Sequence, residues 1–201
     1  MKCVSERLRD KFQNKRIALV GGAKHHAPQD VLDGYDYIVK VNYKAKLKKF
    51  HGLYLSADCA PIIDNDLKPE FVIFNTCAAH NGCMDKVTEL YQRPGIELFP
   101  YCHHEGWFRE LHNQIGSEPL TGCTAIRHFL DMGAAVIFVT GCDLYAKNFA
   151  LPYQIGIHDI RKHHDWLIGI NLNLKVFFDD TLFNVINLKN YYFPVKRSIP
   201  L

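Results

Sequence analysis

A Thr-Gly pair at the start of a predicted helix has residue types and spacing suited to binding an anion. Thr121 and Gly122 open this helix, and the apolar strand run after it is followed by Asp143 and Tyr145. The first turn of a helix presents backbone N–H groups without intrahelical acceptors, and the helix dipole adds positive potential there. We expect Thr121 to cap the helix, Gly122 to allow close approach of a ligand, and Tyr145 to donate to it. The segment therefore predicts a site for a phosphate or a similar anion.

A second candidate is the loop VGGAKHHA, which follows a short apolar run at residues 16–20. Gly21 and Gly22 would let the backbone approach a ligand, and Lys24 could neutralise a phosphate. The spacing is neither GxGxxG nor a P-loop. An ordinary strand-to-helix turn with a solvated Lys24 is therefore an equal alternative.

The third candidate is His158, which stands on a short loop just before a predicted helix. An imidazole titrates near neutral pH and suits a general base; a surface histidine is the alternative. Asp143 could accept a hydrogen bond from a ribose, or it could form a turn. Tyr145 could pack against other side chains instead of binding a ligand.

The hydrophobic pattern of the sequence predicts the fold that would position these candidate residues. Short apolar runs alternate with helical stretches, which predicts an α/β fold, Rossmann-like, with a mostly parallel sheet and helices on both faces. Strands are expected at 16–20, 35–41, 51–56, 71–74, 96–100, 134–140 and 174–178, and helices at 5–14, 85–92, 107–113, after Thr121 and at 159–170. Polar residues end five of the strands: Gly21-Gly22, Asn42, Ala57-Asp58, Asn75-Thr76 and Asp143. In a parallel sheet these ends share the edge where ligands bind.

The bulk composition narrows the class of protein. The 201 residues are 48% hydrophobic and 22% charged, with a net charge of +3. We expect one domain over residues 1–201 with a short lid around 146–157. No apolar run is long enough for a membrane span. Seven scattered Cys residues without a CxxC pair favour reduced thiols and a cytoplasmic location, with peripheral binding at a membrane surface left open.

Neither a metal nor a nucleic acid is expected. The paired histidines 25–26, 103–104 and 163–164 are sequence neighbours, whose side chains point apart on a helix or strand. Lysines 40, 44, 46, 48 and 49 indicate a solvated basic loop, or one that steers an anionic ligand. No pattern of stacking aromatics accompanies them.

Three segments together resemble the sialyltransferases, most closely the small soluble bacterial enzymes. Residues 16–43 resemble the first motif, a strand, a Gly-rich loop, an acidic-aromatic turn and a strand ending in Asn. Residues 119–145 resemble the second, Thr-Gly, helix, strand and Gly-x-Asp-x-Tyr. In the third, a Gly-His is followed at the family's spacing by a helix Leu, here His158 and Leu167. The family carries Asn where this chain has Gly22, and the expected lid is shorter here.

The resemblance implies a variant of the GT-A fold and a glycosyltransferase that takes a sugar from CMP-sialic acid or a similar CMP-sugar donor. It implies donor binding by Gly21, Gly22, Asn42, Thr121 and Gly122, contact of Tyr145 with the donor phosphate, and His158 as the base. Lys24, Asp58, Cys123 and Asp143 complete our candidate nucleotide-binding set. The resemblance also implies chemistry without a metal or other cofactor.

The expected partners are the CMP-sugar donor and a glycan or other hydroxyl acceptor, and a homo-oligomer is left open. Gly22 and the short lid leave two alternatives on the same scaffold. One is a nucleotide-processing enzyme, a hydrolase or a pyrophosphokinase. The other is a protein that binds a nucleotide or glycan without turnover.

Overall fold

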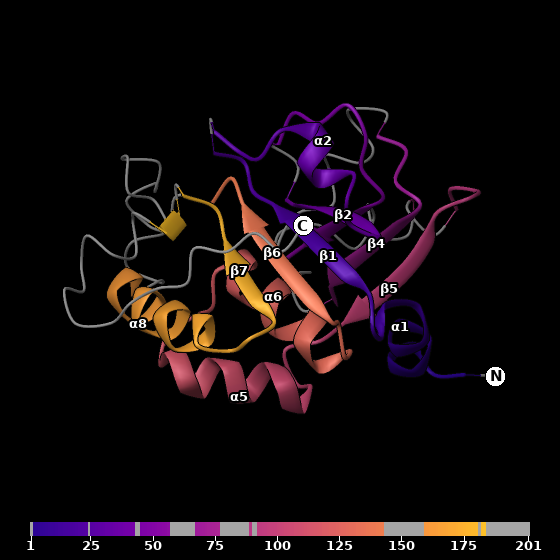
Figure 1. The fold of residues 1–201 in the computed structure, drawn as a ribbon. Coiled ribbons are helices and arrows are strands. Elements are labelled where there is room, and N and C mark those ends of the chain that lie inside the picture. Colours follow the sequence, from indigo (N-terminus) through magenta and orange to yellow (C-terminus); the bar gives the residue numbers. More distant parts are fainter. Residues whose placement is uncertain are drawn as a thin grey trace.

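Seven parallel strands form one continuous sheet in the order β5-β4-β3-β2-β1-β6-β7 (Figure 1). The computed structural model describes residues 2–23, 25–42, 45–56, 67–76, 89, 92–142, 159–180 and 182–183. The strands are β1 (Arg16–Val20), β2 (Tyr37–Val41), β3 (Gly52–Leu55), β4 (Phe71–Asn75), β5 (Glu97–Tyr101), β6 (Val136–Thr140) and β7 (Val176–Phe178). They lie at the predicted apolar runs, because strands covered on both faces need apolar side chains on both.

Helices cover both faces of the sheet, which confirms the predicted fold class. Among the described residues, α1 (Val4–Phe12), α5 (Gly106–Ile115), α6 (Thr121–Asp131) and α8 (Ile160–Asn171) contribute to one large apolar core. The short α2 (Gln29–Leu32) packs on the opposite face (Figure 1). Sequence periodicity did not predict α2, because one turn is too short to show a pattern. Most of the helix expected at 85–92 lies outside the described residues.

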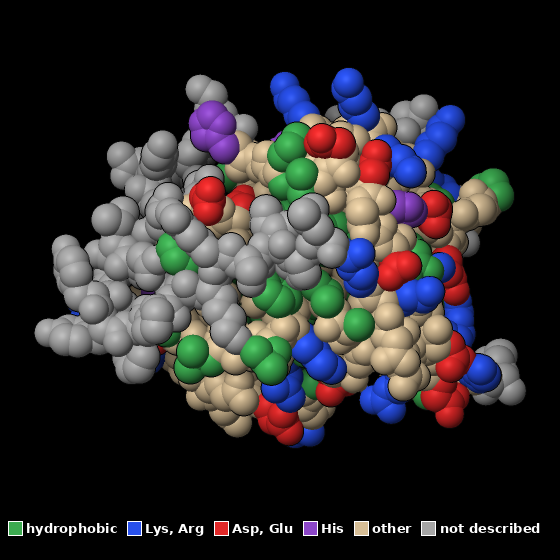
Figure 2. Space-filling view, viewed as in Figure 1, with side chains coloured by type: hydrophobic (Ala, Val, Ile, Leu, Met, Phe, Trp, Pro, Cys, Tyr) green, Lys and Arg blue, Asp and Glu red, His purple; other side chains and the backbone are tan. Residues whose placement is uncertain are grey.

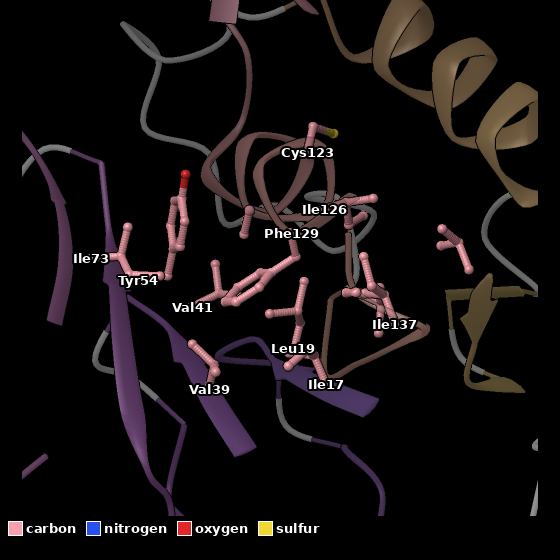
Figure 3. Close-up of a cluster of buried hydrophobic side chains, with 14 of the residues drawn as sticks. Ile17, Leu19, Val39, Val41, Tyr54, Ile73, Cys123, Ile126, Phe129 and Ile137 are labelled. Carbon is pink, nitrogen blue, oxygen red and sulfur yellow. The ribbon is translucent and has the colours of Figure 1, made fainter. Parts of the chain in front are cut away.

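Helix α6 packs directly on the centre of the sheet. Ile126 and Phe129 point from the helix onto Leu19, Val39 and Val41 of the central strands (Figure 3). The helix ends at Asp131, Met132 is its C-cap, and Gly133 follows with φ +82°. Glycine adopts this left-handed conformation without steric cost, which makes it suitable for the position after a helix C-terminus. The helix is thereby fixed under the strand ends that carry the candidate site.

One predicted feature of the surface is wrong. Lys40 lies inside β2 and is only 4% exposed, so it does not belong to a solvated basic loop. Its ammonium lies 4.9 Å from the centre of the Phe50 ring, and burial lowers its pKa. Lys46, Lys48 and Lys49 are exposed as expected. On the face drawn in Figure 2, Lys and Arg side chains are spread among Asp and Glu.

None of the described helices combines the length and the apolar character needed to cross a membrane.

Candidate functional site

The strand order puts a topological switch point between β1 and β6. The chain proceeds from β1 to β5 on one side of the sheet and then returns to the other side of β1 with β6 and β7. At such a switch point the loops after two adjacent parallel strands diverge, and α/β proteins bind ligands in the crevice between them. Here the two loops begin with Gly21 and Gly141.

These two glycines bring the loops into direct backbone contact. Gly21 N–H donates to Thr140 O at 2.8 Å, and Ala23 N–H donates to Gly141 O at 2.8 Å. A Cβ on Gly21 would lie 2.4 Å from Gly141 O and 2.5 Å from Cys142 Sγ. The two loops can therefore pack in this way only because residue 21 has no side chain. Gly22 is exposed, and it remains the loop residue that a ligand can approach.

A carboxylate that sequence analysis did not single out fixes this end of the sheet. Asp179 follows β7, and its Oδ2 accepts from Thr140 Oγ1 at 2.5 Å and from Gly141 N–H at 3.0 Å. Thr140 Oγ1 in turn accepts from Ala27 N–H at 2.7 Å. The loop after β1 and the ends of β6 and β7 are thus joined through one carboxylate. The rule that polar residues follow strands could have identified it, since Asp179 comes directly after the last predicted strand.

The start of α6 differs from the prediction in one respect. Thr121 does not cap the helix: Leu120 is the N-cap residue, with extended backbone, and no side chain caps the first turn. The Thr121 hydroxyl is instead hydrogen-bonded to the hydroxyl of Ser56, at the end of β3. Leu120 takes the cap position because its N–H donates to His163 Nε2 at 3.0 Å and its carbonyl accepts from Thr124 N–H at 2.9 Å.

The first turn of α6 presents open hydrogen-bond donors. Within the described part of the chain, no group accepts from the backbone N–H of Thr121, Gly122 or Cys123. Thr121 and Gly122 are half-buried. Free N–H groups at a helix N-terminus favour an anion. The anion site predicted for Thr121 and Gly122 is therefore compatible with the geometry.

The side chain of Cys123 is buried and does not reach the carboxyl edge of the sheet as a ligand-binding group would. Its side chain is 1% exposed and belongs to the core, and burial, with a smaller contribution from Cys142, raises the pKa of its thiol. Cys142 is half-buried, and its sulfur would lie 4.0 Å from a Cβ on Gly122. Cys142, which sequence analysis did not select, thus lies between the Gly21 turn and the start of α6.

Asn42 stands at the end of β2 in a left-handed conformation, with φ +59°. Asparagine tolerates this conformation better than most residues. Its N–H donates to Tyr54 O at 2.9 Å, which continues the sheet. Within the described chain its side-chain amide has no hydrogen-bond partner, and the residue is half-buried. The amide is therefore available to a ligand at the carboxyl edge.

A buried aromatic cluster packs around His128, in the last turn of α6. His128 Nδ1 is 3.0 Å from the hydroxyl of Tyr54, and its ring stacks on Trp107 at 4.1 Å between centroids. Trp107 and Phe108 are buried and anchor α5 to the core. Burial lowers the pKa of His128 to about 3, so the imidazole is neutral in the folded protein.

We expect the protein to lose stability as the pH falls below the ordinary histidine pKa of 6.5 toward about 3. In this range the unfolded chain binds a proton at His128 and the folded protein does not. The contribution of His128 therefore falls by about 1.4 kcal/mol per pH unit. Urea unfolding as a function of pH measures this, and His128→Gln should reduce the slope relative to wild type. The exposed His112→Gln should keep it; equal slopes in wild type and His128→Gln would contradict the assignment.

Residues 116–120 connect α5 to α6 and contact α8. Ser117 Oγ accepts from Asp159 N–H at 3.2 Å, and Asp159 is the N-cap of α8. His163, fully buried on α8, accepts from Leu120 N–H, and its Nδ1 donates to Asp159 O at 2.7 Å. Nε2 of the same imidazole also lies 3.1 Å from the backbone oxygen of Glu118. The start of α8 is thereby attached to the segment that leads into α6.

Several predicted site residues lie outside the described residues: Lys24, Asp58, Asp143, Tyr145, His158 and the expected lid at 146–157. Of the predicted set, the structure brings Gly21, Gly22, Asn42, Thr121 and Gly122 to the carboxyl edge of the sheet. Over the described ranges, no cluster of three His, Cys, Asp or Glu side chains could hold a metal ion.

No family model and no curated protein matches the chain. Two solved structures that match are of the sialyltransferase CstII from Campylobacter jejuni. Its complex with the substrate analogue CMP-3FNeuAc gives a TM-score of 0.49 and 11% identity, over 82% of this chain and 79% of that one. Its complex with cytidine-5'-monophosphate gives 0.47 and 12%, over 83% and 79%.

Proposed function

We propose that the protein is a glycosyltransferase of sialyltransferase type, which transfers a sugar from a CMP-activated donor to a hydroxyl acceptor. The observation that carries the proposal is the open first turn of α6, where the N–H groups of Thr121 and Gly122 lack acceptors among the described residues. Gly22 and the amide of Asn42 stand on the same edge. The resemblance of all three sequence segments to the family supports the choice of nucleotide.

In the proposed reaction one proton is transferred, one bond to the anomeric carbon forms, and one bond from that carbon to a phosphate oxygen breaks. The acceptor oxygen attacks the anomeric carbon of the donor sugar and gives its proton to His158. The bond between that carbon and the phosphate oxygen breaks, and CMP leaves with both electrons. The N–H groups of Thr121 and Gly122 and the hydroxyl of Tyr145 stabilise the departing phosphate. In this proposal, these backbone and side-chain groups stabilise the charge without a metal ion.

The position of α8 supports a base at residue 158. The next residue, Asp159, is hydrogen-bonded to Ser117, four residues before Thr121 in the chain. The start of α8 is therefore attached to the same segment as the proposed phosphate site. A base must lie close to the reacting atoms, and this attachment is compatible with that requirement.

CMP should bind, and Asn42→Gly should weaken its binding about tenfold by removing one amide from the site. Glycine keeps the left-handed backbone, so the fold should be preserved. Asn14→Gly is the matched control, because Asn14 has φ +60° and is exposed in the turn after α1. Isothermal titration calorimetry with CMP and CDP measures both variants.

No affinity of the wild type for CMP or CDP would refute the proposed function. A preference for a purine nucleotide in the same titrations would instead favour a nucleotide-processing enzyme. Equal CMP affinity of Asn42→Gly and Asn14→Gly would remove Asn42 from the site.

A further inference from the structure

Two exposed leucines lie on the turn between α8 and β7, which we call the leucine turn (residues 172–175). Among the described residues, the large hydrophobic side chains that are exposed are Leu172, at 58%, and Leu174, at 75%. They follow the end of α8 at Asn171 and precede the start of β7 at Val176. Single exposed apolar side chains are common on proteins, but a pair that protrudes from one short turn indicates a surface that contacts a partner.

Hydrogen bonds hold the leucine turn in one shape. The N–H groups of Leu172 and Asn173 donate to carbonyls in the last turn of α8, at 3.2 and 2.9 Å. Asn173 Oδ1 accepts from Lys175 N–H at 3.0 Å, and the Asn173 carbonyl accepts from Val176 N–H at 3.2 Å. Because the backbone that carries both leucines is already ordered, covering them costs little conformational entropy.

Two lysines stand beside the leucine turn at the amino edge of the sheet, the edge where the parallel strands begin. Lys175 directly precedes β7 and Lys15 directly precedes β1, and both are exposed. Lys175 O accepts from Ile137 N–H at 2.7 Å. Lys15 O accepts from Ala135 N–H at 2.8 Å, on the other side of the start of β6. The turn therefore combines apolar side chains with flanking positive charge.

The other charges near this part of the amino edge leave a small positive excess. Arg16 begins β1, and two exposed carboxylates, Asp36 and Asp131, lie before β2 and at the end of α6. With Lys15 and Lys175, three cations stand against two carboxylates. This balance complements an anionic surface, but only weakly, so the leucines must supply most of the affinity for a partner.

A lipid bilayer suits this surface better than another protein does. Protein interfaces bury about 1,000 Å² or more around a core that is depleted in lysine, and two leucines beside lysines offer too little apolar area for one. At a bilayer, leucine side chains enter the boundary between head groups and acyl chains, while lysine stems extend and bring the ammonium groups to the lipid phosphates. No complementary shape is needed for this contact.

We propose that the leucine turn docks the protein reversibly on an anionic membrane surface, with Leu172 and Leu174 inserted and Lys15 and Lys175 at the lipid phosphates. The inference does not depend on the proposed function. The turn lies at the amino edge, so the candidate site at the carboxyl edge is separated from it by the length of the strands, about 17 Å for the five residues of β1 (Figure 1). The docked protein would therefore hold that site away from the membrane, open to the aqueous side.

Co-sedimentation of the full chain with vesicles tests the inference. The vesicles contain phosphatidylcholine alone or with about 30% phosphatidylglycerol, and the wild type should bind the anionic ones more tightly. Leu172→Ser/Leu174→Ser should lower partitioning into both kinds about tenfold or more, because it removes the groups that enter the bilayer. Lys15→Gln/Lys175→Gln should lower partitioning about tenfold into the anionic vesicles and leave that into neutral vesicles unchanged.

Arg109→Gln/Arg161→Gln is the matched control, because it also removes two positive charges. Both arginines are exposed, one on α5 and one in the first turn of α8, at the other end of that helix from the leucines. This variant should bind both kinds of vesicle as the wild type does. Leu174→Trp gives a second measurement, since its added fluorescence should be quenched by vesicles with brominated acyl chains.

Three results would overturn the inference. The first is a wild type that binds neither kind of vesicle, and the second is equal binding by the wild type and the leucine variant. The third is a wild-type dimer that the leucine variant dissociates, since the leucines would then contact a second copy of the chain. Equal losses in the lysine variant and the arginine control would remove Lys15 and Lys175 from the contact.

Discussion

Replacing Gly21 by alanine is expected to lower the free energy of unfolding by about 3 kcal/mol. The new Cβ would lie 2.4 Å from Gly141 O and 2.5 Å from Cys142 Sγ, both below the 3.0 Å that real Cβ contacts respect. The nearer obstacle is backbone, which cannot turn away as the end of a side chain can. Gly141 is itself constrained, with φ +66° and a site for Cβ only 2.8 Å from Gly21 O.

Gly169→Ala is the matched control for this effect. Gly169 lies in α8, and a Cβ there would meet no atom within 4 Å. Alanine is the better helix former, so this variant should be more stable by about 0.5 kcal/mol or more. Chemical denaturation measures both. A Gly21→Ala protein as stable as wild type would show that the two loops are not packed as described.

The second large effect is expected at His158. Removing a general base typically costs two to four orders of magnitude, so His158→Ala should slow sugar transfer about a thousandfold. CMP affinity should remain at the wild-type value, because the proposed nucleotide contacts come from other residues. Release of CMP from a CMP-sugar donor, followed with and without acceptor, measures the rate.

His112→Ala is the control for the loss of an imidazole, since His112 is exposed on α5. It should transfer sugar at the wild-type rate. If His158→Ala keeps full activity, another group is the base. If neither protein turns over a CMP-sugar while both bind CMP, the chain binds the nucleotide without catalysis.

The strands could be predicted from the sequence because a parallel sheet covered on both faces requires continuous apolar runs. The end of α6 could also be predicted from the sequence, since Gly133 occupies a left-handed position that few other residues accept. Lys40 was misassigned because charge alone suggested a loop. Its aliphatic stem can be covered by the apolar groups around β2, and only the ammonium needs a favourable contact.

Only the candidate site residues that directly follow a strand could be predicted from the sequence. Gly21, Gly22 and Asn42 follow their strands directly, so the strand prediction also located them. The pairs Ser56–Thr121 and Asn75–His103 join residues far apart in the chain. Nothing local in the sequence indicates such partners, because they depend on which strands are neighbours. Thr121 was expected as a cap because its residue type suits one, but the hydrogen bonds of Leu120 place the helix start one residue earlier.

The short connection from α5 to α6 constrains how this protein can be engineered. Within residues 116–121, Ser117 contacts Asp159, Leu120 contacts His163, and Thr121 contacts Ser56. Inserting or deleting a single residue there would put at least one of these contacts out of register. Substitutions in this connection should therefore exchange side chains and keep its length constant.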